Sequence, residues 1–298
     1  MDIVPHVTRE HRSWLFVPGD DERKLARSAE SPADALIYDL EDAVVPDRRS
    51  VARELVGAIV ASPPTSAAAP WVRINPLDTP DALADLTAVV RPHLAGIVLP
   101  KIRSGADVTA LARHLDELEP RAGMAAGTVG IMVVATETPE MLFRLGELVG
   151  ASPRLQACTW GAEDLSTALG ASTNRADDGA WDSPYELARS LALFAARAAD
   201  AQPVDTLHAA FTDDAGLTAA AQRAARQGFT GMLAIHPRQV PIINEQMTPS
   251  AEAVAEAHAV VAAFAARPDA GTVSLEGRML DRPHLTQAQR LLQRAAAT

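Results

Sequence analysis

The segment SWLFVPGD, residues 13–20, begins a pattern that recurs along the chain. A short apolar run is followed by a turn with proline and glycine, and then by a helical pattern that reaches Glu30. A second apolar run at Ala35–Leu40 is followed by a second helical stretch at Arg48–Ala61. Strands that are buried on both faces of a parallel sheet read as nearly continuous apolar runs, and helices connect them. The segment therefore predicts strand–helix units of the parallel α/β type.

Eight such units follow one another at intervals of roughly 30 residues, which predicts a (β/α)8 TIM barrel. An open, doubly wound sheet is the alternative fold. That fold often has a GxGxxG first turn, whereas the turn here is Pro18-Gly19-Asp20-Asp21. The predicted strands are Ser13–Val17, Ala35–Leu40, Trp71–Ile74, Gly96–Leu99, Val129–Ala135, Leu155–Trp160, Thr206–Phe211 and Gly231–Ile235.

We expect the barrel, as the catalytic domain, to occupy residues 12–248. Residues 249–298 exceed what eight units need. Their pattern predicts a helix at Ala251–Ala266, a loop, and a final helix at Leu285–Ala297. We expect this C-terminal extension to act as a lid or as an arm that reaches another subunit.

The composition narrows the class of protein. Of 298 residues, 48% are hydrophobic and 22% are charged, which is typical of a globular chain and not of a disordered one. The net charge of −11 argues against a nucleic-acid partner. No apolar run is long enough to span a bilayer, and the first residues lack a signal-peptide pattern. We therefore expect a cytoplasmic protein with no membrane partner. The single cysteine, Cys158, lies within a predicted strand and is expected to be an inert buried thiol.

Polar residues follow the predicted strands at the end where a parallel barrel places its active site. Helix capping is the alternative explanation. It suits Thr138 and Asp213, but it does not suit Arg73 or Glu137, which precede the proline-marked starts of their helices. The polar residues at these strand ends are Asp39, Glu41, Asp42, Arg73, Asn75, Lys101, Glu137, Glu163, Asp164 and His236.

Glu137 and Asp164 follow neighbouring strands and are expected to converge on the barrel axis. Oxygen ligands without clustered histidine or cysteine favour a hard cation such as Mg²⁺. The alternative is a pair of buried carboxylates bonded to backbone amides or to Arg73. Glu163 is a rival for the ligand role of Asp164, because it is the adjacent acid.

The cationic and histidine side chains allow more than one interpretation. The planar guanidinium of Arg73 suits a carboxylate or thioester oxygen, and the alternative is a structural pair with Asp39 or Glu41. Lys101 could form a Schiff base, but we interpret it as an ion-pair residue. His236, before a proline, is interpreted as a packed or loop-bonded histidine. The acidic run after the second strand could hold a base or orient metal-bound water, although such runs are often solvated.

Seven short motifs occur in order along the chain. Together they resemble the citrate lyase β-subunit-like proteins of the HpcH/HpaI aldolase superfamily, a group that includes malyl-CoA, citramalyl-CoA and citryl-CoA lyases. The resemblance extends from Arg12 into the extension. The motifs are RSWLFVPGD (12–20), DLEDAV (39–44), VRIN (72–75), LPK (99–101), ET (137–138), WGAEDL (160–165) and IHP (235–237).

The resemblance implies a Mg²⁺-dependent lyase, with Mn²⁺ as a substitute metal. Such an enzyme breaks or forms a carbon–carbon bond in a 3-hydroxyacyl-CoA thioester, so an acyl-CoA and a keto acid would be its small-molecule partners. By motif, Glu137 and Asp164 would be the metal ligands, and Glu137 would also lie against the substrate. Arg73 would bind substrate oxygens, Phe16 would lie near the thioester, and Asp42 would belong to the acidic shell around the metal.

The segment EGRMLD, residues 276–281, resembles the part of related lyases that brings an aspartate over the site of a neighbouring protomer. Asp281 would then be the catalytic acid or base, and the assembly would be a homotrimer or a dimer of trimers. Three alternatives remain open: a metal-dependent pyruvate aldolase acting on free acids, a citrate lyase β subunit that needs an acyl-carrier partner, and a non-catalytic barrel subunit.

Overall fold

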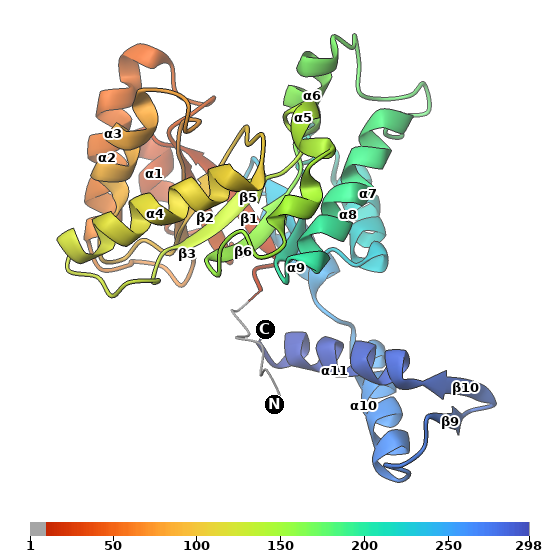
Figure 1. The fold of residues 1–298 in the computed structure, drawn as a ribbon. Coiled ribbons are helices and arrows are strands. Elements are labelled where there is room, and N and C mark those ends of the chain that lie inside the picture. The colour runs from red at the N-terminus through yellow and green to blue at the C-terminus, as the bar shows by residue number, and fades with distance from the viewer. Residues whose placement is uncertain (1–9, 298) are drawn as a thin grey trace.

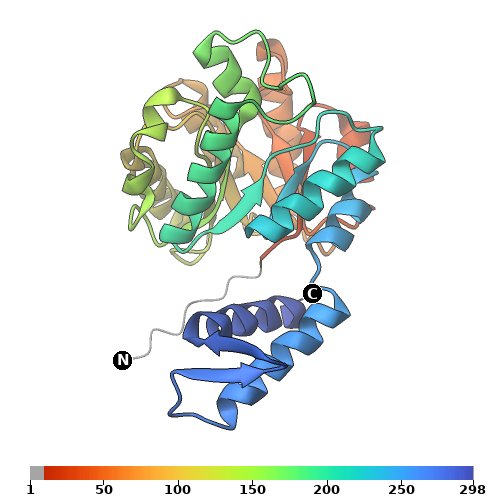
Figure 2. The same cartoon turned by 90° about the vertical axis from the view of Figure 1, so that its right-hand side faces the viewer.

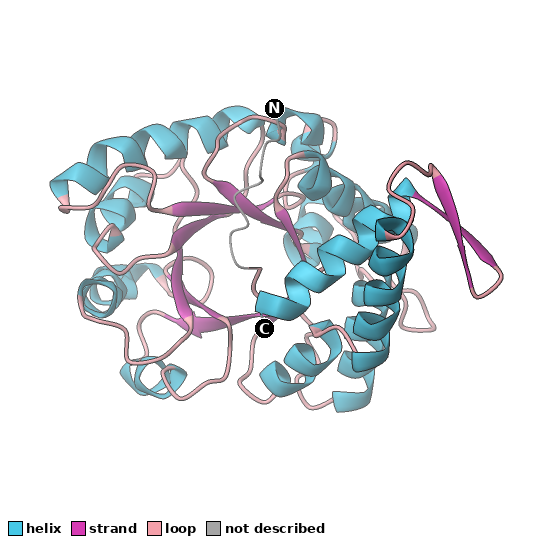
Figure 3. Ribbon diagram, turned by 90° about the horizontal axis from the view of Figure 1, so that it is seen from below, coloured by secondary structure: helices cyan, strands magenta, loops and turns pink. Residues whose placement is uncertain are grey.

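The computed structural model describes residues 10–297. Eight parallel strands form a closed barrel, in which β1 pairs with both β2 and β8 (Figure 1, Figure 3). Closure is set by the register Ser13↔Met232 on one side and Trp14↔Ala35 on the other. The predicted (β/α)8 barrel is therefore confirmed, and the doubly wound sheet is excluded.

The strands of the barrel are β1 Ser13–Pro18, β2 Ala35–Asp39, β3 Ala69–Arg73, β4 Gly96–Leu99, β5 Gly130–Val134, β6 Leu155–Thr159, β7 Gln202–Asp205 and β8 Gly231–Ala234. The helices around it are α1 Glu22–Ser28, α2 Arg49–Ala61, α3 Asp81–Val89, α4 Gly105–Arg121, α5 Pro139–Leu142, α6 Ala162–Leu169, α7 Ser183–Ala198, α8 Asp214–Gln227 and α9 Gln239–Met247. Two short 3₁₀ turns, η1 Pro46–Arg48 and η2 Leu145–Leu148, complete it.

The alternation of side chains along the strands explains why the barrel has an apolar interior and a polar mouth. Successive residues of a barrel strand point inward and outward by turns. Ala35 and Ile37 of β2 and Trp71 of β3 belong to the apolar cluster inside the barrel. The next inward positions on these strands are Asp39 and Arg73, which are register partners. The same alternation thus carries a carboxylate and a guanidinium to the carboxyl ends of the strands.

The seventh strand was predicted at Thr206–Phe211, and this prediction is wrong. β7 occupies Gln202–Asp205, and the apolar run that comes after it is a loop. The strand contains two polar residues and a proline, but each polar side chain has a specific partner. The side-chain amide of Gln202 bonds the backbone of His11, and Asp205 accepts hydrogen bonds from Trp160 and Arg189. Such distant partners leave no apolar pattern in the sequence.

The helices largely agree with the prediction, with one omission. α6 was not predicted, although its end is marked by Gly170 in the left-handed conformation, with φ of 69°. Asp213 caps α8 by accepting from the Gly216 amide, as expected. The Thr138 hydroxyl instead donates to the Ile102 carbonyl oxygen. Within residues 10–297, no helix has both the length and the apolar character needed to cross a membrane.

The C-terminal extension contains α10 Ala251–Ala265, a hairpin of β9 Thr272–Leu275 and β10 Arg278–Asp281, and α11 Arg282–Ala297. Its buried residues, among them Val260, Phe264 and Leu280, form an apolar cluster of their own. The extension lies below the barrel in Figure 1 and Figure 2. One cavity is lined both by α11 and by Trp14 and Trp71, near the amino ends of their strands. The extension therefore lies at the end of the barrel opposite the polar mouth.

A prediction concerns Gly96, which begins β4 beneath the indole of Trp71. A methyl group at Gly96 would collide with three carbons of that ring. Trp71 is 2% exposed and cannot move away. We expect Gly96→Ala to lower the free energy of unfolding by about 1–3 kcal/mol, the usual cost of overpacking. Urea denaturation measures it. Gly146→Ala is the control, since nothing lies within 4 Å of its added Cβ; equal stability of both variants would contradict the prediction.

Candidate active site

Glu137 lies at the barrel mouth, shortly after the end of β5. Its side chain is buried, and its Oε2 accepts a hydrogen bond of 2.6 Å from the backbone amide of Lys101, after β4. On the other side lies Gly161, after β6. A Cβ at Gly161 would stand 2.8 Å from Cγ of Glu137, so only glycine fits there. The neighbouring strand ends thus fix the Glu137 carboxylate from both sides.

Lys101 has an unusual backbone conformation. Its φ of 50° lies in the left-handed region, which a residue with a side chain adopts at a cost of about 1–3 kcal/mol and mainly at functional sites. In this conformation the backbone amide of Lys101 donates its hydrogen bond to Glu137. The Nζ atom lies 2.5 Å from Glu41, 3.1 Å from Asp42 and 3.4 Å from Asp164. The interpretation of Lys101 as an ion-pair residue is confirmed, and its contacts connect Glu137 with Asp164.

Arg73 forms the structural pair that was weighed as the alternative to substrate binding. Its Nε and Nη2 atoms donate to the two oxygens of Asp39 at 2.8 and 2.6 Å, and Nη1 lies 3.1 Å from Glu41. The guanidinium carbon lies 4.8 Å from the centre of the Phe16 ring. Burial alone would lower the pKa of Arg73, but the charge and hydrogen bonds of Asp39 raise it above its ordinary value. Arg73 is a permanent cation at the mouth.

The environment of Glu137 shifts its protonation. Burial is the main cause that raises the pKa of Glu137, to about 8, and the charges of Asp164 and Glu41 add to it. The Lys101 amide and the Arg73 charge oppose this shift without cancelling it. Burial also raises the pKa of Glu41, against the charges of Arg73 and Lys101. Carboxylates at this mouth are therefore crowded beyond what the cations present can balance.

The donor set fits a divalent cation. A cation between Glu137 and Asp164 would relieve the repulsion that raises the Glu137 pKa. Among residues 10–297, no group of three or more His, Cys, Asp and Glu side chains is arranged to hold a metal. Two carboxylates would leave coordination positions for water and substrate oxygens, as Mg²⁺ requires. The charged groups of the mouth are the acids Asp39, Glu41, Asp42, Glu137 and Asp164 and the cations Arg73 and Lys101.

Some residues of the predicted set have other contacts. Glu163, in the first turn of α6, accepts a hydrogen bond of 2.9 Å from the side chain of Asn174 in the loop after α6. The ring of His236 stacks on Phe211 at 5.0 Å, and its Nδ1 accepts from the Arg238 amide. The prediction of a loop-bonded histidine is confirmed.

Cys158 is buried as predicted. Its thiol belongs to the large apolar cluster between barrel and helices. Burial raises the pKa of the Cys158 thiol to about 12, so the reactive thiolate does not form near neutral pH.

Asp281 does not join this mouth within one chain. It is the last residue of β10, its side chain is 42% exposed, and its Oδ1 lies 2.5 Å from Nδ1 of His284. Because the extension lies at the opposite end of the barrel, Asp281 can reach a mouth of this kind only in another copy of the chain.

Two features of the site were missed from the sequence. Gly161 leaves room for Glu137. Its position directly after an apolar strand could have indicated this role. The left-handed conformation of Lys101 had no signal, because lysine has no preference for it. Both features fix the position of Glu137. Neither changes which residues lie at the mouth.

Fold and site together define a class: a (β/α)8-barrel protein with an acid-rich mouth that suits a divalent cation. Comparisons with known proteins agree. The HpcH/HpaI aldolase/citrate lyase family model matches residues 12–237. The chain therefore belongs to the HpcH/HpaI aldolase/citrate lyase family, and the resemblance noted in the sequence is confirmed.

Individual relatives cover nearly the whole chain. The citrate lyase subunit beta of Escherichia coli K12 is 35% identical over 290 residues, which cover 97% of this chain and 94% of that protein. The L-malyl-CoA/beta-methylmalyl-CoA lyase of Cereibacter sphaeroides is 33% identical over 309 residues, with 98% and 96% covered. The crystal structure of CitE from Mycobacterium tuberculosis, in complex with magnesium, acetoacetate and coenzyme A, has a TM-score of 0.76 at 34% identity, with 95% of this chain and 97% of that one covered.

The pKa of Glu137 leads to a prediction about metal binding. Below about pH 8 the carboxylate is protonated, and a cation must displace that proton. We expect Mg²⁺ affinity to weaken by about tenfold per pH unit as the pH falls from 8 to 6, the slope for one competing proton. Isothermal titration calorimetry in two buffers of different ionisation enthalpy measures the affinity and the proton released. Glu137→Gln should abolish both; an affinity that stays constant over this range would refute the competition.

Proposed function

We propose that this protein is a Mg²⁺-dependent carbon–carbon lyase that cleaves or forms a 3-hydroxyacyl-CoA thioester, such as malyl-CoA, citramalyl-CoA or citryl-CoA. Its products in the cleavage direction are acetyl-CoA or another acyl-CoA and a keto acid. The observation that carries the proposal is the convergence of Glu137, Asp164 and Arg73 at one barrel mouth, where carboxylates outnumber cations. The named relatives, lyases among them, support the same chemistry.

The reaction needs a base, an acid and charge stabilisation. In cleavage, a base removes the proton of the 3-hydroxyl group, and the bond between C2 and C3 breaks. Its electron pair passes to the thioester as an enolate, and a proton is then added at C2. Bound Mg²⁺ would supply Lewis-acid polarisation of the keto-acid oxygens. Glu137 and Asp164 are the residues that would hold it.

Arg73 has the properties needed for the oxygen that gains charge. Asp39 holds Nε and Nη2, which fixes the guanidinium, while Nη1 lies at the mouth beside Glu41. A fixed cation needs no rearrangement when charge develops, and such preorganised groups give the largest catalytic contributions. Phe16, stacked on Arg73, would form the apolar wall beside the thioester. Asp42, held by Lys101 at 3.1 Å, would belong to the acidic shell and orient water.

We further propose that Asp281 acts as the acid or base at the mouth of another protomer, within a homotrimer or a dimer of trimers. Its distance from its own mouth and its half-exposed carboxylate support this arrangement. His284, 2.5 Å away, would orient the carboxylate. In this proposal residues 12–248 form the catalytic domain, and residues 249–298 form the arm between subunits. A cytoplasmic location, where CoA thioesters are made, is part of the same proposal.

A second candidate is favoured by the relative from Escherichia coli. If the chain were a citrate lyase β subunit, it would act on an acyl group carried by a partner protein. Purified protein with Mg²⁺ and a panel of 3-hydroxyacyl-CoA thioesters decides between the two. Release of glyoxylate, pyruvate or oxaloacetate from a free CoA thioester supports the lyase. No product from any thioester, with activity only on an acyl-carrier protein, supports the subunit.

The ligand assignment predicts the effect of isosteric substitutions. Glu137→Gln and Asp164→Asn keep the side-chain volume but remove the negative charge that binds a cation. We expect Mg²⁺-dependent turnover to fall at least 1,000-fold in each, about 4 kcal/mol of transition-state stabilisation, with an unchanged circular dichroism spectrum. Glu163→Gln is the matched control and should keep turnover within about threefold, or about 0.7 kcal/mol. Wild-type turnover in either variant would remove that residue from the metal site.

The role of Asp281 predicts complementation between subunits. Asp281→Asn alone should slow turnover by about 10²–10⁴-fold, the usual contribution of a general acid or base, and leave Mg²⁺ binding intact. Mixed with Glu137→Gln after reversible dissociation, it should regain activity. Mixed oligomers contain sites in which an intact mouth meets an intact Asp281. No recovery in oligomers shown to be mixed by mass spectrometry would contradict the arrangement between subunits.

A further inference from the structure

A large cavity lies at the end of the barrel away from the catalytic mouth. Its volume is about 1100 Å³, and it is enclosed by the amino ends of the strands, the end of α7 and the helix α11. Trp14 and Trp71 form its apolar floor at the base of the barrel. α11, whose residues line the cavity, lies below the barrel in Figure 1. The cavity is therefore separate from the site formed by Glu137 and Asp164.

The charge of this cavity is opposite to that of the whole chain. Its lining contains three acids, Glu10, Asp34 and Asp200, and twice as many arginines. Asp34 forms an ion pair with Arg12 at 2.8 Å. Glu10 forms ion pairs with Arg197 at 3.7 Å and with Arg294 at 3.5 Å. The protein has a net charge of −11, so a cationic cavity is not a consequence of its composition. The arginines are Arg12, Arg197, Arg226, Arg282, Arg290 and Arg294.

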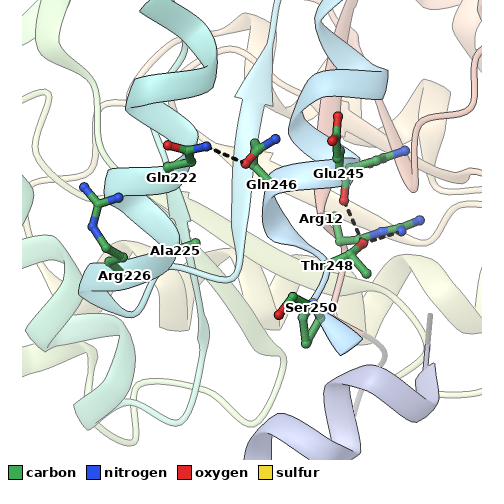
Figure 4. A pocket seen from close by; sticks show the side chains of 10 residues that line it. Arg12, Gln222, Ala225, Arg226, Glu245, Gln246, Thr248 and Ser250 are labelled. Atoms are coloured by element: carbon green, nitrogen blue, oxygen red, sulfur yellow. Dashed lines mark hydrogen bonds between the residues drawn. The ribbon is translucent and has the colours of Figure 1, made fainter. Parts of the chain in front are cut away.

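Two of these arginines have no acidic or hydrogen-bonding partner among the described residues. In residues 10–297, neither Arg226 nor Arg290 has an ion pair or a side-chain hydrogen bond. Figure 4 shows Arg226 extending from the end of α8 with no bond to the residues drawn, beside a second hollow of about 700 Å³ that also contains Arg12. Burial lowers the pKa of Arg197 against the charge of Glu10, and the charges of Arg290 and Arg294 lower it further. Cations that repel one another in this way favour a bound anion.

Buried polar groups of the floor also lack partners. Trp71 Nε1 and Thr230 Oγ1 belong to residues that line the cavity, and both atoms are buried without a hydrogen-bond partner in the described part of the chain. Buried donors are nearly always paired, so such groups need an explanation. Leu193 and Phe194 of α7 add apolar surface to the same wall.

We propose that this cavity binds a small organic polyphosphate. The phosphate groups would bind Arg197, Arg226 and Arg290, since guanidinium groups pair with phosphate through two parallel hydrogen bonds. An aromatic or apolar moiety would lie against the tryptophan floor. The volume exceeds what a single inorganic phosphate fills and lies just above the usual range of small-molecule sites, about 300–1,000 Å³. The site lies at the base of the barrel and takes no part in the proposed lyase reaction.

The test uses ADP, tripolyphosphate and adenosine as probes of full-length protein, by isothermal titration calorimetry without Mg²⁺. We expect ADP to bind, with an affinity that falls as NaCl is raised. Adenosine should not bind, and tripolyphosphate should bind at least tenfold more weakly than ADP. If tripolyphosphate binds as well as ADP, the proposal that the ligand has an organic moiety is wrong. No binding of ADP would overturn the site.

Variants locate the binding. Arg226→Ala with Arg290→Ala should weaken ADP binding at least 30-fold, and neither change removes an ion pair or a side-chain hydrogen bond of the described residues. Arg290→Gln is the milder second variant, with at least a fivefold loss expected. Arg267→Ala, an exposed arginine of the extension outside the cavity, is the control and should bind as the wild type does. Undiminished ADP binding by the double variant would place the ligand elsewhere, at the catalytic mouth for example, and overturn the proposal.

Discussion

The mouth of the barrel depends on the pairing of Asp39 with Arg73. These residues are register partners on β2 and β3, so the strand geometry brings them together before any side chain is placed. The Asp39 carboxylate also accepts the backbone amides of Glu41 and Ala43, at 3.0 and 3.1 Å. One buried carboxylate therefore fixes both the guanidinium and the course of the acidic loop. Removing one partner of such a buried pair typically costs about 3–5 kcal/mol.

This pairing also explains why the acids of the mouth have too few cations as partners. Arg73 is the most buried cation of the mouth, and two of its nitrogen atoms are bound to Asp39. Lys101 is shared among three carboxylates. Burial is the main cause that raises the Glu137 pKa to about 8, the charge of Asp164 adds to it, and neither cation offsets the two. A site with this imbalance gains most from a divalent cation, because two positive charges enter without a further side chain.

Hydrophobic periodicity was enough to predict the architecture, but it failed where distant partners decide the structure. The closed barrel, and the polar ends of strands two to six, could be predicted from apolar runs and their spacing. The strand at Gln202–Asp205 could not, because its polar side chains are satisfied by His11, Trp160 and Arg189 from elsewhere in the chain. The choice between Glu163 and Asp164 was open for a similar reason. In the structure Glu163 contacts Asn174, eleven residues further on, whereas Asp164 contacts Lys101; neither partner could be read from the sequence.

The two ends of the barrel carry opposite charge, and the fold explains how one chain keeps them apart. Acids at the carboxyl ends of the strands face one side, while arginines from α7, α8 and α11 gather at the other. The apolar layer that contains Ile37, Met132 and Trp71 fills the barrel between them. In this low-dielectric layer the opposite charges cannot meet and neutralise each other. Each end therefore keeps an excess of one sign, and an anion drawn to the arginines does not compete with a cation drawn to Glu137 and Asp164.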